Sequence, residues 1–172
     1  NAINEVIREA EIQGEGTITN VVLKVEAAAN ATAIETTLPK EAVTQLAAAG
    51  ISTLTITTPT GAISFDANTL SGLAEEAAGD LKVSIFRVDK TSLSPEVLTM
   101  IGDRPVYDIT VASGEKEISQ FGGDVKVSLP YTPEEGEDIN AIVIYYINET
   151  GELEIVTNCL YDPATGMVTF TT

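Results

Sequence analysis

The residue types that most often carry out catalysis are scarce in this sequence. It contains no His and a single Cys, Cys159, which excludes imidazole catalysis, His-ligated metals and an internal disulfide. Cys159 has neither a His partner nor a clustered base, so we expect a buried or idle thiol. Residues 113–116 (SGEK) match the S-x-x-K pattern of a serine nucleophile. However, the partner motifs are missing and the serine falls in a predicted turn. We predict no enzyme, no catalytic residue and no cofactor.

The densest group of acidic residues is Glu134, Glu135, Glu137 and Asp138, which surround Gly136. Oxygen-rich loops bind calcium, so these four residues are the calcium candidates of the sequence. Their spacing differs from that of an EF-hand, where acids stand at alternate positions before a glycine and a glutamate follows later. A solvated turn is therefore favoured over a calcium site, and we predict no metal site.

Tyrosines are the best candidates for binding. Tyr145 and Tyr146 are adjacent on a predicted strand, so one is expected to point inward and the other outward. Tyr107 and Tyr131 lie near predicted strand ends. An outward tyrosine can stack on a sugar ring or anchor a protein contact. The same rings can equally cover a sheet edge, and this structural alternative is the favoured one.

The charge balance excludes one class of partner. Nine Lys and Arg residues stand against 26 Asp and Glu residues, which gives the 172-residue chain a formal charge of −17. Nucleic-acid binding requires clustered basic residues, so we expect none. A large net charge also discourages self-association, and we expect a monomer. The apolar runs are far shorter than the roughly 18 residues of a membrane span, so we expect no membrane insertion.

The elements that position these residues are mainly short strands. We expect residues 1–18 to be an N-terminal arm or short helix, and residues 19–172 to be a single β-rich domain excised from a longer protein. A hairpin is predicted over residues 52–66, around the turn Pro59-Thr60-Gly61. Helices are predicted after Pro39, over residues 66–78, and after the capping pair Ser94-Pro95.

The last third of the chain carries the clearest strand pattern. Strands are predicted over residues 105–112, 124–130, 141–148, 152–157 and 167–172, with turn residues between them. Short strands at this spacing indicate an antiparallel sandwich or barrel. The predicted fold class is mainly β, an antiparallel β-sandwich or partly open barrel with two or three short helices.

Several runs of this region resemble a known module. They are residues 101–111 (IGDRPVYDITV), 121–133 (FGGDVKVSLPYTP), 142–147 (IVIYYI), 151–154 (GELE), 161–162 (YD) and 165–172 (TGMVTFTT). Together they resemble a β-rich module of large exported proteins from Gram-positive, often clostridial, bacteria. Such proteins frequently end in S-layer homology repeats that hold them to the cell wall. The resemblance extends over residues 38–172.

The same region is similar to the β-sandwich domain of ankyrins and netrin receptors, which ends in a self-cleaving His-Phe-Ser junction. This sequence contains no His-Phe-Ser, so no self-cleavage residue is carried over. The resemblance implies an extracellular location, associated with the cell wall or S-layer, and a noncatalytic role. It implies no particular ligand.

Three functions follow as hypotheses. The first is a noncatalytic structural or spacer module of an exported, cell-wall-attached bacterial protein. The second is a carbohydrate-binding module for cell-wall or plant polysaccharide. The third is a protein-docking module of an extracellular enzyme complex. The expected partners are thus a polysaccharide or another cell-surface protein. A groove lined by outward tyrosines would favour glycan binding, and an apolar patch of interface size would favour docking.

Overall fold

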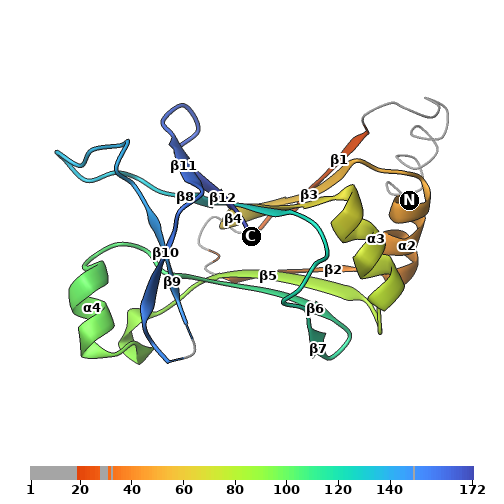
Figure 1. Ribbon diagram of the computed structural model, residues 1–172, viewed down its shortest axis with the longest axis horizontal. Coiled ribbons are helices and arrows are strands. Elements are labelled where there is room, and N and C mark those ends of the chain that lie inside the picture. The colour runs from red at the N-terminus through yellow and green to blue at the C-terminus, as the bar shows by residue number, and fades with distance from the viewer. Residues whose placement is uncertain (1–18, 28–30, 32, 149) are drawn as a thin grey trace.

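Two β-sheets lie face to face and form the body of the molecule (Figure 1). The computed structural model describes residues 19–27, 31, 33–148 and 150–172, so the predicted N-terminal arm lies outside the described residues. The first sheet has the strand order β1-β3-β4-β8-β12-β11, and the second sheet has the order β2-β5-β6-β7. Strands β9 and β10 form a separate hairpin at one end of the molecule.

The strand bounds agree with most of the predicted ranges. The strands of the first sheet are β1 (Asn20–Lys24), β3 (Thr53–Thr58), β4 (Gly61–Asp66), β8 (Val125–Pro130), β11 (Cys159–Asp162) and β12 (Met167–Thr171). Those of the second sheet are β2 (Ala33–Leu38), β5 (Leu81–Arg87), β6 (Tyr107–Ser113) and β7 (Lys116–Glu117). The separate hairpin consists of β9 (Ile144–Ile147) and β10 (Leu153–Val156).

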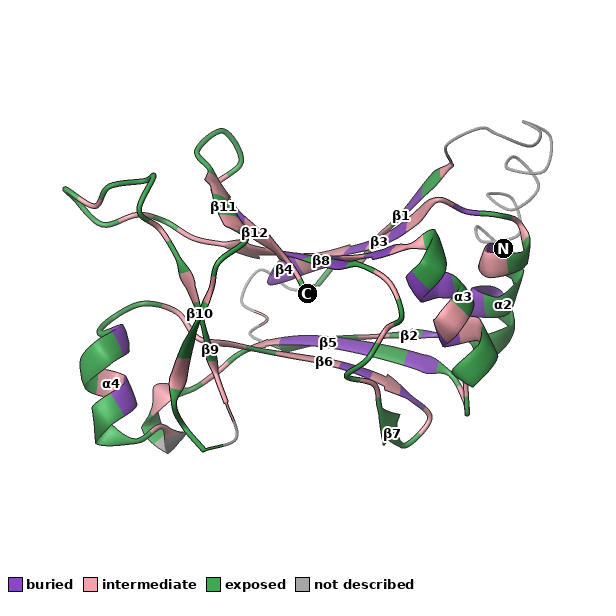
Figure 2. Cartoon of the chain, in the orientation of Figure 1, coloured by how far each residue is buried: buried purple, intermediate pink, exposed green. Residues whose placement is uncertain are grey.

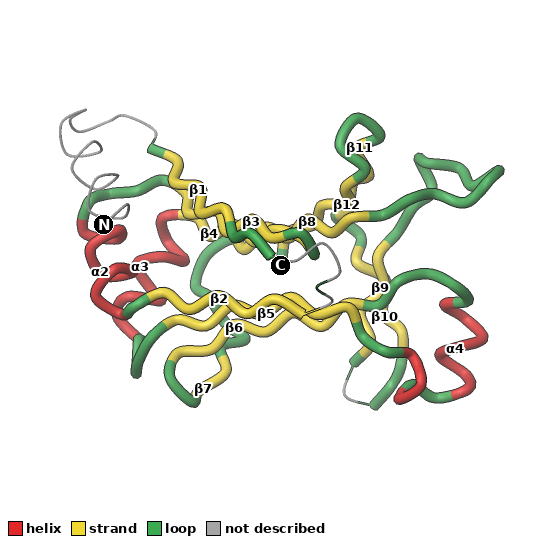
Figure 3. The backbone as a smooth tube through the Cα atoms, turned by 180° about the vertical axis from the view of Figure 1, so that it is seen from behind, coloured by secondary structure: helices red, strands yellow, loops and turns green. Residues whose placement is uncertain are grey.

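Helices cover the two ends of the sheets rather than their faces (Figure 3). The helices are α2 (Lys40–Ala48), α3 (Ala67–Glu76), the single 3₁₀ turn η1 (Lys90–Ser92) and α4 (Pro95–Ile101). Helix α3 begins where Asp66 accepts a hydrogen bond from the Thr69 amide at 2.8 Å. Helix α4 begins in the same way, because the Ser94 hydroxyl accepts from the Val97 amide at 3.3 Å. Asp66 therefore starts α3, and the predicted capping residue Ser94 starts α4.

The hydrophobic core lies between the two sheets and against α2 and α3 (Figure 2). Leu54 and Ile56 on β3 alternate with threonines, and both are fully buried. Val83 on β5 of the second sheet belongs to the same core cluster, and Ile85 on β5 is buried as well. This alternation is typical of strands with one buried face, and it confirms the sandwich-like arrangement.

Of the two predicted alternatives, the structure has the sandwich-like one, because the strands do not close into a barrel and each sheet keeps its own edge strands. One feature of the predicted topology is corrected: β1 pairs with β3 in parallel, whereas every other described pair is antiparallel. After β1, the chain crosses to the second sheet as β2 and returns through α2. It therefore re-enters the first sheet in the same direction, as a crossover connection requires.

Strands β2, β7 and β11 were not predicted. In β2, Thr36 lies among inward-facing residues between Ile34 and Leu38, so the alternation of apolar and polar side chains is interrupted. In β11, a run assigned to a turn pairs with β12, Tyr161 lying opposite Val168. Strand β2 depends on a partner that is distant in sequence, β5, whereas β11 pairs with β12 directly across a short turn.

None of the helices in the described part of the chain has the length and apolar character needed to cross a bilayer.

Candidate functional site

A large open cleft is lined by residues of both sheets, of the segment around the end of α4 and of the β9–β10 hairpin. Helix α4 and this hairpin lie at the same end of the molecule (Figure 1). The volume of the cleft is about 1190 Å³, which exceeds the roughly 300–1,000 Å³ of a small-molecule pocket. Aliphatic and aromatic side chains from both sheets and the hairpin dominate the lining. They include Ile63, Ile109, Val111, Val125, Val127, Leu129, Val168 and Phe170 from the sheets, and Ile144, Ile147, Leu153 and Val156 from the hairpin.

The cleft opens directly onto the hydrophobic core. Val125 and Val127 are buried members of the core cluster, and both also line the cleft. Ile109, Leu129 and Phe170 pack against the same cluster but remain only partly buried. In a closed sandwich such inward side chains would be covered from both sheets. Here the core continues to a surface that solvent or a ligand can reach.

All four tyrosines predicted as binding residues line this cleft. Tyr145 and Tyr146 come from β9, Tyr107 begins β6, and Tyr131 directly follows β8. The prediction that one of Tyr145 and Tyr146 points into the protein is wrong, since their side chains are 48% and 56% exposed. The reason is that the β9–β10 hairpin is a separate two-stranded ribbon, so neither of its faces is fully covered.

Tyr107 links the two sheets across the cleft. Its hydroxyl donates a hydrogen bond to the backbone oxygen of Pro130, at 3.0 Å. Burial raises the pKa of Tyr107 above its ordinary value of 10.0, and the positive charge of Arg87 partly opposes this shift. The phenol is therefore neutral and able to donate at physiological pH.

Tyr131, Glu137 and Arg104 form a polar cluster at the edge of the cleft. The Tyr131 hydroxyl donates to Glu137 Oε2 at 2.6 Å, and Arg104 Nη2 donates to Glu137 Oε1 at 3.2 Å. Burial, and then the hydrogen bond to Glu137, raise the pKa of Tyr131. The Tyr131 ring also lies edge-on to that of Tyr161, with 6.3 Å between the ring centroids. Tyr131 is thus fixed in orientation from both sides.

The acidic loop is organised by this cluster rather than as a cation cage. Glu137 turns toward Tyr131 and Arg104, and its Oε2 also accepts from the Glu134 amide at 3.1 Å. The Asp138 carboxylate accepts instead from the Asn140 backbone amide at 2.9 Å. Among the described residues, no group of three or more acidic, His or Cys side chains is arranged to hold a metal. Glu134, Glu135, Glu137 and Asp138 are not brought together as calcium ligands.

The Glu137 contacts make stability depend on pH. Hydrogen bonds from Tyr131, from the Glu134 amide and from Arg104 lower the pKa of Glu137 below its ordinary value of 4.5. A carboxylate with a lowered pKa stabilises the folded state above its unfolded pKa and loses this contribution as the pH falls through the folded pKa. We therefore expect Glu137→Gln to reduce the free energy of unfolding at pH 7. The difference from the wild type should shrink steadily below pH 4.5.

Urea denaturation between pH 3 and pH 8 measures this effect. The control is Glu135→Gln, which removes the same charge from an exposed position of the same loop. Equal losses for the two variants at every pH would show that the cluster contributes nothing beyond the general charge.

The charged side chains that line the cleft are mostly acidic. They are Arg104, Asp108, Glu117 and Glu137. Because Arg104 is paired with Glu137, Asp108 and Glu117 leave the lining with a net negative charge. Both of these residues are exposed. The cleft therefore combines an apolar interior with an acidic edge on β6 and β7.

Ser113 and Cys159 have structural positions. The buried Ser113 hydroxyl donates to the Gly79 oxygen at 3.0 Å and accepts from the Gly79 amide at 3.1 Å. Its S-x-x-K pattern thus reflects the β6–β7 turn held against the end of α3. Cys159 is half-buried on β11, and its thiol lies 3.7 Å from the Ile142 oxygen.

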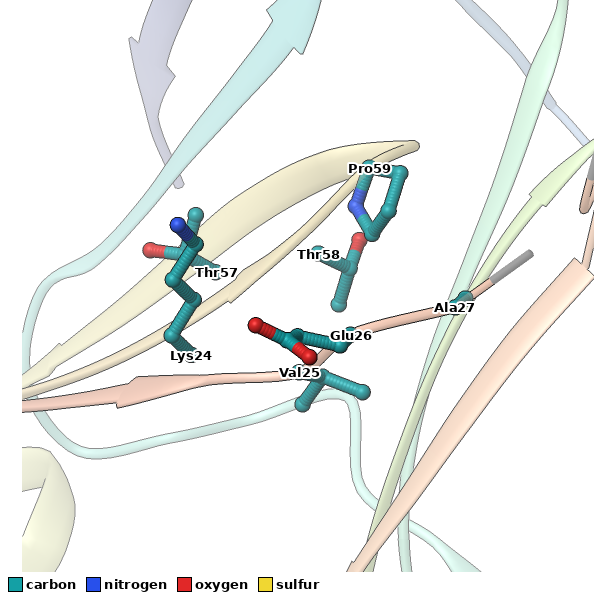
Figure 4. Close-up of a pocket in the computed structure, with 7 residues that line it drawn as sticks. All are labelled: Lys24, Val25, Glu26, Ala27, Thr57, Thr58 and Pro59. Carbon is teal, nitrogen blue, oxygen red and sulfur yellow. The ribbon is translucent and has the colours of Figure 1, made fainter. Parts of the chain in front are cut away.

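A smaller hollow of about 360 Å³ lies where β1 ends beside the β3–β4 turn (Figure 4). It is lined by Lys24, Val25, Glu26, Ala27, Thr57, Thr58 and Pro59. The Glu26 carboxylate and the Lys24 stem project into it. The hollow is much smaller than the cleft and borders residues outside the described part.

No family model, curated protein or solved structure matches this chain. The resemblance to a surface-protein module therefore stays an expectation, and the cleft is the main guide to function. The sequence indicated the tyrosines of the cleft, because aromatic rings with a polar hydroxyl are uncommon among the aliphatic residues of its strands. It did not indicate the aliphatic lining, since Ile109, Val127 and Phe170 have the spacing of ordinary core residues.

Proposed function

We propose that this domain is a noncatalytic module that docks another protein in the cleft between its sheets. The proposal rests on the opening of the cleft, which is lined by side chains such as Ile109, Leu129 and Phe170 that pack against the core and remain partly exposed. Burying apolar surface stabilises a complex by about 25 cal/mol per Å² before the costs of association. A protein segment supplies enough apolar area to fill a volume of this size.

The chemistry of the lining favours a protein over a glycan. Sugars need many hydrogen-bonding side chains beside their aromatic platforms, whereas this lining is mainly aliphatic. The polar groups of Arg104, Glu137 and Tyr131 are already bonded to one another. Tyr145 and Tyr146 point to opposite faces of β9, so one of the two rings acts as a large amphipathic anchor at the entrance, the role in which tyrosine is enriched at protein interfaces.

A spacer role explains less of the structure, because a passive module gains nothing from leaving its core open. We further propose that docking takes place outside the cell, on a protein attached to the cell wall or S-layer. The acidic composition and the resemblance of residues 38–172 support this location.

Two binding assays, peptide display and retention on polysaccharide gels, together test the proposal. A phage library of random peptides is panned on the folded domain, and the domain is also passed over cellulose, xylan, chitin and purified cell wall, with and without calcium. We expect the panning to enrich peptides, and we expect these peptides to bind the Tyr145→Ala, Tyr146→Ala double variant at least about tenfold more weakly than the wild-type domain. The control is Leu160→Ala, which removes a side chain that is 73% exposed on β11 and should leave binding unchanged.

Two outcomes would contradict docking. Retention on a polysaccharide that disappears in the double variant would establish a carbohydrate-binding module. Neither peptide binding nor retention, with the domain shown to be folded, would leave the spacer function.

A further inference from the structure

Strand β6 has an edge that its neighbour covers only in part. Strand β7 pairs with β6 at Ala112 and Ser113, and the Ile118 amide donates to the Val111 oxygen at 2.8 Å. In the described part of the chain, no strand lies beside the rest of β6 on this side. The exposed edge runs from Tyr107 to Thr110, about four residues or about 13 Å of extended chain, because the Val111 oxygen is already bonded to Ile118.

Two hydrogen bonds at the ends of the β5–β6 pair define which backbone groups this edge presents. The Val88 amide donates to the Val106 oxygen at 2.9 Å, and the Gly114 amide donates to the Asp80 oxygen at 3.0 Å. Successive residues of an antiparallel strand bond to opposite sides. Residues 108, 110 and 112 therefore bond to β5. Tyr107 and Ile109, in phase with Val111, direct their N–H and C=O groups to the open edge.

The same residues direct their side chains into the cleft. Tyr107, Ile109 and Val111 all line it, and Val111 belongs to the core cluster. Side chains that lie opposite one another on paired strands share a face of the sheet. A strand added along β6 would therefore place every second side chain over the apolar lining and leave the others on the outer face.

Charge sets the chemistry of those outer positions. Asp108 is exposed and lies between Tyr107 and Ile109, so its side chain belongs to the opposite phase. Glu117 lies on the adjacent strand β7, and the chain as a whole carries a charge of −17. Opposite charges across a strand pair are favourable and like charges are not. A basic side chain opposite Asp108 is therefore preferred.

We propose that the cleft accepts an extended segment of a partner protein as an added strand on β6, with apolar residues alternating with Lys or Arg. The proposal rests on the docking function and specifies its partner. Backbone hydrogen bonds to Tyr107 and Ile109 hold the segment, and the cleft selects its apolar side chains. A second copy of this domain is a poor occupant, because two acidic edges would repel each other.

Designed peptides test this arrangement directly. We expect the peptide KVKITVK to bind at least about tenfold more tightly than EVEITVE at low salt. It should also bind more tightly than KKKTVIV, which has the same composition without the alternation. N-methylation of one alternate set of amides should abolish binding, and methylation of the other set should leave it intact, since only one set faces β6.

Amide hydrogen exchange by NMR gives a residue-level readout. We expect the peptide to slow exchange at Tyr107 and Ile109 by at least about tenfold, with little change at Asp108 and Thr110, whose amides already face β5. Asp108→Lys should weaken KVKITVK by about fivefold or more. The control is Glu75→Lys, the same charge change at an exposed position on α3.

Other outcomes distinguish a failure of the strand-addition proposal from a failure of the docking proposal. Cleft binding by display-selected peptides, without protection of Tyr107 and Ile109, would overturn strand addition and leave docking intact. If neither designed nor selected peptides bind, both proposals fall. Protection of Tyr107 and Ile109 in the free protein would overturn strand addition, and a rise with protein concentration would identify a second copy as the occupant.

Discussion

Replacing Gly61 by alanine is expected to reduce the free energy of unfolding by about 2–4 kcal/mol. Gly61 begins β4 with a φ of +151°, a conformation that L residues rarely adopt. A Cβ atom there would lie 2.8 Å from the Ser128 backbone oxygen and 3.1 Å from Leu129 Cδ2. Those atoms belong to β8, the strand that pairs with β4 in the middle of the first sheet. The methyl group would therefore push apart the two central strands.

The matched control is Gly50→Ala, after helix α2. Gly50 also has a positive φ, +66°, but nothing lies within 4 Å of the position its Cβ would take. We expect a loss of about 1–2 kcal/mol there, the cost of the left-handed backbone alone. Urea denaturation of both variants separates backbone strain from the collision with β8. Equal losses would mean that β8 moves aside at no cost.

Replacing Phe65 by alanine is expected to have an effect of similar or greater size, about 3–5 kcal/mol. Phe65 is fully buried on β4, where it lies opposite Leu54 on one side and Val125 on the other. Its ring centroid is 6.3 Å from that of Phe121. Truncation to alanine would leave a cavity in the core, and the expected loss is a large part of the roughly 5–15 kcal/mol that stabilise a domain. Thermal unfolding followed by circular dichroism measures the loss.

Leu160→Ala is the control for Phe65→Ala. It also truncates a large apolar side chain on the first sheet, but one that is 73% exposed on the edge strand β11. We expect a change within about 0.5 kcal/mol. A Phe65→Ala loss that small would mean that the core around Phe65 collapses to fill the space.

The local elements of this fold could be predicted because their signals are local. Asp66 caps α3 and Ser94 caps α4, each by accepting a hydrogen bond from the amide three residues later, and Pro95 occupies the first turn of α4. The β3–β4 hairpin follows from Pro59-Thr60-Gly61 and the alternating side chains beside it. Each of these features depends on residues that are neighbours in the chain.

The arrangement of the sheets could not be predicted in the same way. The parallel pairing of β1 with β3 depends on the path of the chain through the second sheet. The cleft exists because β7 covers only the end of β6 and because the β9–β10 hairpin stands apart. Residues such as Ile109 and Phe170 have the same spacing in the sequence whether the sandwich is open or closed. The tyrosines could be predicted as binding candidates, but the sequence did not predict that all four would line one cleft.

The strand order of the first sheet also determines when this domain can fold. Strand β4 is in the middle of that sheet, and its partner β8 follows about sixty residues later in the chain. Until β8 emerges from the ribosome, the β3–β4 hairpin keeps an unpaired edge with Ile63 and Phe65 uncovered. Contacts of such high sequence separation slow folding to milliseconds or longer. Partly made chains thus expose an aggregation-prone edge, and the native sheet forms late, once the C-terminal strands are available.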